Sequence, residues 1–92
     1  MYIILVYDIP LDNGGPKVSR NIFKICKKYL SHIQNSVFEG ELSKSQLAKL
    51  EFELDQFIRK DEDSVIVFKS RNERWLEKEF LGVEDDKTSN FF

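Results

Sequence analysis

The sequence is poor in the residues that disulfide-linked folds and most hydrolase sites need, since its 92 residues include one cysteine and one histidine. A single cysteine excludes an internal disulfide and a cysteine-based zinc site, and it fits a reducing cytoplasm. A single histidine, His32, argues against a Ser-His-Asp triad, and we expect it to be a capping or surface residue. No apolar run approaches the roughly 20 residues of a membrane span. Residues 2–7 are too short for a signal peptide and end at Asp8. The sequence therefore predicts a cytoplasmic protein with no membrane segment.

Acidic residues are missing from one long interval of a chain whose net charge is −2. Between Asp12 and Glu39 there is none, and the interval carries five basic residues: Lys17, Arg20, Lys24, Lys27 and Lys28. A locally basic surface can steer a polyanion such as DNA or RNA, even on an acidic protein. A solvated, lysine-rich helix face is the alternative interpretation.

Hydrophobic spacing predicts the element order βαββαβ. The expected strands are 2–7, an alternating segment SVFEGEL that follows a short piece within 32–42, and 64–70; the expected helices are 16–30 and 44–59. Pro16 suits the first turn of the first helix, and Ser43 with Gln46 forms a capping box before the second. The order fits an α+β, ferredoxin-like fold, in which a four-stranded antiparallel sheet carries both helices on one face.

The chain is short enough to be a single domain, which we divide into a core, 1–70, and a C-terminal segment, 71–92. Residues 74–83 suit a helix by one spacing and a strand by another. Two phenylalanines end an otherwise polar tail. We expect the segment to be a strand that docks on the partner protomer of a homodimer.

The first strand ends on Asp8, with no histidine, cysteine or second acid beside it. A turn cap over Asn13 and Gly14 is one interpretation. A metal site is the other, and it needs further oxygen ligands. Mg²⁺ takes few carboxylates when waters and phosphate oxygens complete its octahedron. In a symmetric homodimer, two copies of Asp8 could face each other across the two-fold axis. This interpretation predicts a shared Mg²⁺ or Mn²⁺ site.

Several segments together resemble the CRISPR-associated protein 2 family: VYDI at 6–9, the basic helix, QNSVFEGEL at 34–42 and DEDSVIVF at 61–68. The resemblance runs from residue 2 to residue 68, and the tail GVEDDKTSNFF is similar to the ending of some members. It implies a ferredoxin-like fold, a homodimer and a divalent-metal site at Asp8. It also implies a role in spacer acquisition, as a metal-dependent endonuclease for RNA or double-stranded DNA. The alternative is a non-catalytic DNA-binding scaffold that bridges dimers of the CRISPR integrase, CRISPR-associated protein 1.

In the catalytic interpretation, a metal-bound water attacks a phosphodiester at Asp8. The other expected site residues are three that hold the nucleic-acid backbone and three that form a wall: Lys17, Arg20 and Lys24; Tyr7, Ser36 and Phe38. The family often has an arginine-rich start to this helix, and here only Lys17 and Arg20 stand there. Lysine cannot grip phosphate with two parallel bonds, so weaker phosphate contacts are expected. A ferredoxin-like ligand-sensing module is a third possibility, but no glycine-rich effector loop lies between helix and strand.

Overall fold

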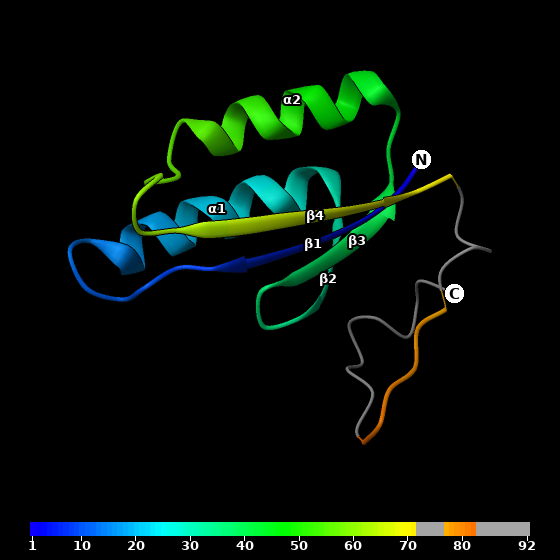
Figure 1. Cartoon of the computed structure of the whole chain (residues 1–92), viewed down its shortest axis with the longest axis horizontal. Helices are drawn as coiled ribbons and strands as arrows, with labels where there is room; N and C mark the ends of the chain where they lie inside the picture. The colour runs from blue at the N-terminus through cyan, green and yellow to red at the C-terminus, as the bar shows by residue number, and fades with distance from the viewer. Residues whose placement is uncertain (72–76, 83–92) are drawn as a thin grey trace.

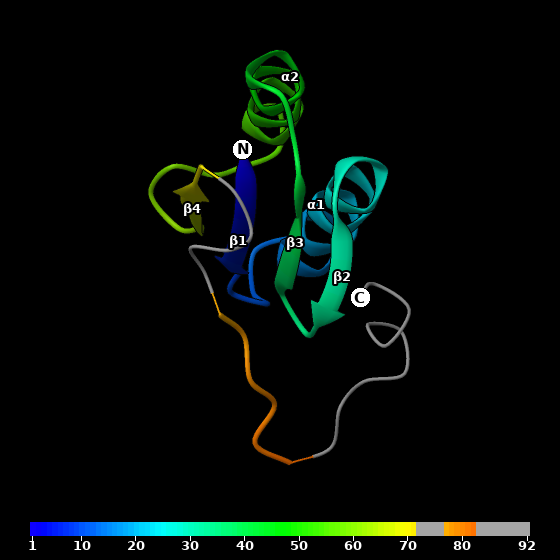
Figure 2. The same ribbon diagram turned by 90° about the vertical axis from the view of Figure 1, so that its right-hand side faces the viewer.

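A computed structural model describes residues 1–71 and 77–82. Its elements, in chain order, are β1 (Tyr2–Asp8), α1 (Gly15–Tyr29), β2 (Ser31–Gln34), β3 (Val37–Glu41), α2 (Lys44–Asp55) and β4 (Ser64–Ser70). The strands form one sheet in the order β2-β3-β1-β4, and every neighbouring pair is antiparallel. Both helices cover the same face of this sheet, as Figures 1 and 2 show. The predicted ferredoxin-like α+β fold is therefore confirmed.

The core lies between the sheet and the two helices. Alternate residues of β1 point toward the helices, so Ile3 and Leu5 are fully buried. Cys26 of α1 and Leu50 of α2 pack into the same cluster. Burial raises the pKa of the Cys26 thiol to about 12, so the thiol is a small apolar core group and an unreactive one. Among the described residues, no helix is long and apolar enough to cross a membrane.

No helix formed by the described residues covers the opposite face of the sheet (Figure 2). Strand register places Ile4 beside Phe68 and Val6 beside Ile66 on this open face. Ile66 is 49% exposed and Phe68 is 53% exposed, which leaves an apolar stripe along β4. Elsewhere on the face Glu39 is only 1% exposed. Its carboxylate accepts a hydrogen bond from the Tyr2 hydroxyl and pairs with Lys78. This pair ties the described C-terminal residues, 77–82, to the open face.

Two expectations about the elements need correction. Helix α2 ends at Asp55 and not at residue 59, because the chain turns at Gln56 and the amide of Phe57 already bonds back to Leu54. His32 does hold the turn that follows β2, since its Nε2 donates to the carbonyl of Asn35 over 2.8 Å, but it is not a simple surface residue. It lies in β2, half-buried, with its ring against those of Phe23 and Phe38.

The C-terminal segment is only partly described. Residues 77–82 form neither helix nor strand in the single chain, and the remainder of the segment lies outside the described residues. Its docking on a partner protomer stays a prediction.

Candidate functional site

The end of β1 opens into a groove with a volume of about 690 Å³. Three parts of the chain meet there: the end of β1 with the loop after it, α1, and the turn between β2 and β3. The lining residues are Tyr7, Asp8, Ile9, Leu11, Ser19, Phe23, Asn35 and Ser36. We call this space the Asp8 groove.

Asp8 itself is exposed, and it pairs through its backbone with Ser64 of β4. Within residues 1–71 and 77–82, its carboxylate makes no hydrogen bond or ion pair. The turn that it could have capped has left-handed backbone at Asn13 (φ 53°) and Gly14 (φ 84°). Arg59 donates to the carbonyls of Asp12 and Asn13 in that turn, and these are contacts that a carboxylate could not make. The geometry thus gives no support to a capping role and leaves a carboxylate open to solvent.

Two of the three expected wall residues line the groove. The amide of Tyr7 donates to the carbonyl of Ser36 over 3.1 Å, which closes the wall between β1 and the β2–β3 turn. Phe38 is fully buried and lies one layer behind, stacked on Tyr7 with ring centroids 6.2 Å apart. It supports the wall and does not line it.

The Tyr7 phenol keeps its proton at neutral pH. Burial, reinforced by the neighbouring Cys26, raises the pKa of Tyr7, while a hydrogen bond with Ser19 acts in the opposite direction. Tyr7 therefore presents a neutral hydroxyl group to its surroundings and no phenolate.

Sequence reasoning missed four lining residues besides Ile9: Leu11, Ser19, Phe23 and Asn35. A signal did exist for two of them. Ser19 and Phe23 are four residues apart, so they share one side of α1, and each directly precedes an expected phosphate-binding residue. Asn35 has left-handed backbone (φ 42°) at the turn, which directs the chain across the groove. Leu11 is 73% exposed at the rim and carries no sequence signal that we recognise.

Lys17, Arg20 and Lys24 are all exposed on α1. Their spacing of three and four residues places them in one stripe along the helix. Because each residue advances the helix by about 100°, the stripe lies next to the side that carries Ser19 and Phe23. None of the three forms an ion pair with another described residue, whereas Lys28 is engaged by Glu53 of α2. A basic strip thus runs beside the Asp8 groove.

One chain offers a single carboxylate in this groove, that of Asp8. No group of three or more histidine, cysteine, aspartate or glutamate side chains that could hold an ion occurs in the part of the chain described here. The single donor is a hard carboxylate oxygen, which suits Mg²⁺ or Mn²⁺. The donor set fits such an ion only if a second copy of the chain contributes its own Asp8.

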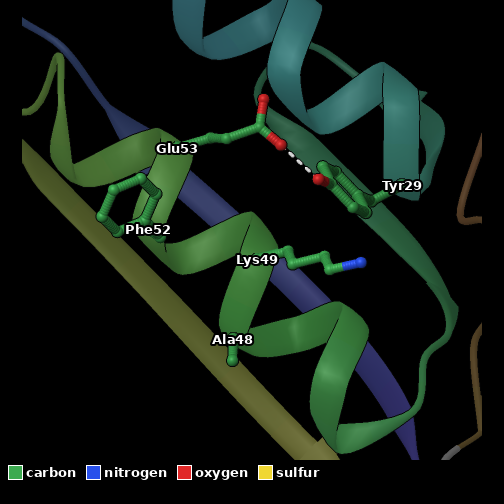
Figure 3. A pocket seen from close by; sticks show the side chains of 5 residues that line it. All are labelled: Tyr29, Ala48, Lys49, Phe52 and Glu53. Carbon is green, nitrogen blue, oxygen red and sulfur yellow. Dashed lines mark hydrogen bonds between the residues drawn. The ribbon is translucent and has the colours of Figure 1, made fainter.

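Another groove lies on the far side of the helix layer, between α1 and α2, and has a volume of about 320 Å³ (Figure 3). It is lined by Tyr29, Ala48, Lys49, Phe52 and Glu53. Here the carboxylate is engaged: Glu53 accepts hydrogen bonds from the Tyr29 hydroxyl and from the Lys28 ammonium. We call this space the interhelical groove.

Fold and site together define a ferredoxin-like domain with an exposed carboxylate, unpaired among the described residues, beside a basic helix. The chain belongs to the family described as CRISPR associated protein Cas2, whose sequence model matches residues 1–78. The family inferred from the sequence is therefore confirmed.

Individual relatives match over almost the whole chain. The CRISPR-associated endoribonuclease Cas2 of Fusobacterium nucleatum is 60% identical over 91 residues, covering 99% of this chain and 86% of the relative. The protein of the same name from Thermotoga maritima is 39% identical over the full length of both chains. Among solved structures, one described as the crystal structure of cas2 superposes with a TM-score of 0.80 at 36% identity, covering 94% of this chain and 91% of that one. Streptococcus pyogenes Cas2 at pH 6.5 gives a TM-score of 0.73 at 28% identity, with 87% and 100% covered.

Proposed function

We propose that two copies of this chain form a divalent-metal-dependent endonuclease that acts on RNA or double-stranded DNA during CRISPR spacer acquisition. The observation that carries the proposal is the exposed Asp8 carboxylate, which pairs with none of the described residues and lies in a groove beside a basic helix. The relatives named endoribonucleases favour RNA as one substrate.

In this proposal Asp8 and Asp8 of the second protomer hold one Mg²⁺ or Mn²⁺ between them. When bound, the ion supplies an activated water and offsets negative charge that develops on the phosphate. The chain itself supplies the groove, with the neutral Tyr7 hydroxyl, the Ser36 hydroxyl and the Asn35 amide around the carboxylate. These groups can donate hydrogen bonds to phosphate or sugar oxygens.

Lys17, Arg20 and Lys24 bind the nucleic-acid backbone in this proposal. The three side chains are exposed and form no ion pair with the described residues, so they are free to neutralise phosphates. Such contacts are independent of base sequence, and they set the salt dependence of binding.

The homodimer is supported by the open face of the sheet. Ile66 and Phe68 leave apolar surface on β4 that a second copy could cover. A domain this small also gains stability from association, because its own core is thin. The C-terminal segment, 71–92, would then dock on the partner.

A second candidate function is a non-catalytic DNA-binding scaffold that bridges dimers of the CRISPR integrase, CRISPR-associated protein 1. One observation favours it: the described residues that line the Asp8 groove include no histidine, lysine or second carboxylate to act as a general base. The basic strip on α1 would serve a scaffold equally well.

The proposal is tested by a cleavage assay on matched RNA and duplex DNA, titrated with Mg²⁺ and Mn²⁺. Asp8→Asn keeps the size of the side chain and removes the charge, so we expect cleavage to fall by about 100-fold or more. Asp61→Asn is the matched control, since Asp61 is an exposed aspartate in the turn before β4. If neither Mg²⁺ nor Mn²⁺ supports cleavage while the protein still binds duplex DNA, the scaffold function is favoured.

Mixed dimers test whether the site is shared. Wild-type and Asp8→Asn protomers are exchanged in known ratios, and cleavage is measured against the wild-type fraction. A shared site predicts that activity follows the square of that fraction. A linear dependence would refute sharing, and light scattering that returns the mass of one chain would refute the dimer.

A further inference from the structure

One side chain holds the loop that follows Asp8. Arg59, which lies beyond the end of α2, donates from Nη1 to the carbonyl of Asn13 over 2.7 Å and to that of Asp12 over 3.4 Å. Its Nη2 donates to the carbonyl of Pro10 over 3.3 Å. These bonds join parts of the chain more than 40 residues apart. They fix the path of 9–14, the loop that brings Ile9 and Leu11 to the Asp8 groove.

The same guanidinium group holds the start of β4. Its Nε donates to Oδ2 of Asp63 over 3.0 Å and its Nη2 to Oδ1 over 2.8 Å, while the Arg59 amide also donates to Oδ2. The Asp63 side chain is fully buried, and the guanidinium beside it lowers the pKa of its carboxyl group. Asp63 directly precedes Ser64, the residue that pairs with Asp8 across the sheet. Asp8 is therefore flanked on both sides by backbone that Arg59 restrains.

The 9–14 loop is tightly packed against the start of α1. A Cβ atom on Gly15 would lie 1.8 Å from the carbonyl oxygen of Pro10 and 3.6 Å from Nη2 of Arg59. The Gly15 amide donates to the Asp12 carbonyl over 3.1 Å. The loop is thus closed by backbone contact at one end and by the arginine fork along its length.

Only arginine can make this set of contacts. Its planar guanidinium presents several N–H donors in a fixed fork, which can pair with a carboxylate on one edge and with carbonyls on another. A lysine ammonium is a compact point charge without that geometry, so it cannot reach the buried carboxylate and three loop carbonyls together.

We infer that Arg59 is a positioning residue of the Asp8 site, holding the carboxylate in the groove by restraining both the loop after it and the strand opposite it. The inference rests on the proposed function. Arg59 touches neither substrate nor ion in this view and acts through the 9–14 loop and through β4. A purely structural role would stabilise the fold and leave the site's chemistry unchanged.

The test is Arg59→Lys, with Arg71→Lys as the matched control, because Arg71 is exposed. Amide hydrogen exchange reports the loop, and kcat and KM report cleavage. We expect exchange in 9–15 to accelerate by about 10-fold or more, since loss of the fork frees the loop. We expect kcat to fall by about 10- to 100-fold with KM nearly unchanged, as when a group that orients a ligand is removed. Arg71→Lys should alter neither.

Each result decides the inference. Unchanged exchange in Arg59→Lys overturns it whatever happens to cleavage, and faster exchange with a wild-type kcat overturns it as well. If the wild-type protein does not cleave at all, the proposed function fails. The positioning role of Arg59 is then tested by binding of Mn²⁺ without substrate. Paramagnetic broadening of amide signals by Mn²⁺ that is centred on Asp8 and weaker in Arg59→Lys supports the positioning role. Equal broadening in the two proteins, or no broadening in either, overturns it.

A second variant covers the case in which Arg59→Lys does not fold. Asp63→Asn keeps the bonds from Arg59 to the loop carbonyls and weakens only the pairing at the start of β4. It should give a smaller change of the same kind in kcat. A wild-type kcat in a folded Asp63→Asn protein whose amides at the start of β4 exchange faster would contradict the inference.

Discussion

Each of the two grooves of this small domain contains a carboxylate, and the two carboxylates differ in their hydrogen-bond partners. In the interhelical groove, Glu53 accepts a hydrogen bond from the Tyr29 hydroxyl (Figure 3) and another from Lys28, so the fold itself satisfies the charge. In the Asp8 groove, the carboxylate has no such partner within residues 1–71 and 77–82. A charge that the fold satisfies contributes to structure, whereas one left open is available to a ligand.

The ionisation of the groups reflects the difference. Hydrogen bonds from Lys28 and then Tyr29 lower the pKa of Glu53, and the bond to Glu53 raises the pKa of both partners. The three groups therefore titrate as a linked set that stabilises the contact between α1 and α2.

The sharpest way to break the comparison is to neutralise each carboxylate separately. Asp8→Asn should lower metal-dependent cleavage by about 100-fold or more. It should leave the melting temperature unchanged, because the Asp8 carboxylate bonds to none of the described residues. Glu53→Gln should leave cleavage unchanged and lower the melting temperature. Cleavage rates and thermal unfolding of both variants check the pair. A loss of cleavage in Glu53→Gln at a temperature where it is fully folded would contradict this division of roles.

A smaller effect is expected from the basic strip beside the Asp8 groove. Replacing Lys17, Arg20 and Lys24 together with alanine should weaken duplex binding by about 10-fold or more at low salt. It should also flatten the slope of log affinity against log salt by about 2 to 3, since fewer counterions are released. Replacing three lysines away from the groove, Lys44, Lys49 and Lys60, controls for net charge. Equal losses in both triple variants would move the binding surface off α1.

The smallest expected effect is the pH dependence of the Glu53 set. The pKa of Glu53 is lower in the folded chain than its unfolded value of about 4.3. Its contribution to the free energy of unfolding is therefore complete above about pH 4.3 and disappears as the pH falls through the folded pKa. The raised pKa values of Lys28 and Tyr29 mean that the contribution is lost again above about pH 10.

We expect wild type to melt only about 2–5 °C above Glu53→Gln across that window, since the pair is exposed. Thermal unfolding of the two proteins from pH 3 to pH 8 measures the difference. A gap that persists unchanged at the acid end would mean that the Glu53 charge is not its source.

Much of the fold could be predicted because its signals are local. The continuous apolar run of β1 and the capping box at Ser43 each specify an element without reference to the remainder of the chain. The end of α2 could not be predicted in this way. Phe57 and Ile58 continue its hydrophobic spacing, yet the backbone has already turned at Gln56, so the apolar period outlasts the helix.

The site residues that belong to a locally recognisable element could be predicted from the sequence. Those that reach the site only because distant segments pack together could not. Asp8 and Tyr7 stand at the end of a recognisable strand, and Ser36 stands at the start of another. Phe23 and Asn35 reach the same groove only through tertiary packing. The role of Arg59 could not be predicted for the same reason. Its partners at the loop are backbone carbonyls, which every residue has, so the sequence carries no signal for these hydrogen bonds.

The contact between Gly15 and the Pro10 carbonyl limits how this chain can vary. Loops on protein surfaces usually tolerate changes in length and composition, because closure entropy grows slowly with length. Here any side chain at position 15 would overlap backbone, with a Cβ only 1.8 Å from the Pro10 oxygen. Saturation mutagenesis should therefore recover glycine alone at this position. A library that varies substrate preference would do better to diversify Leu11, whose exposed side chain borders the groove without closing the loop.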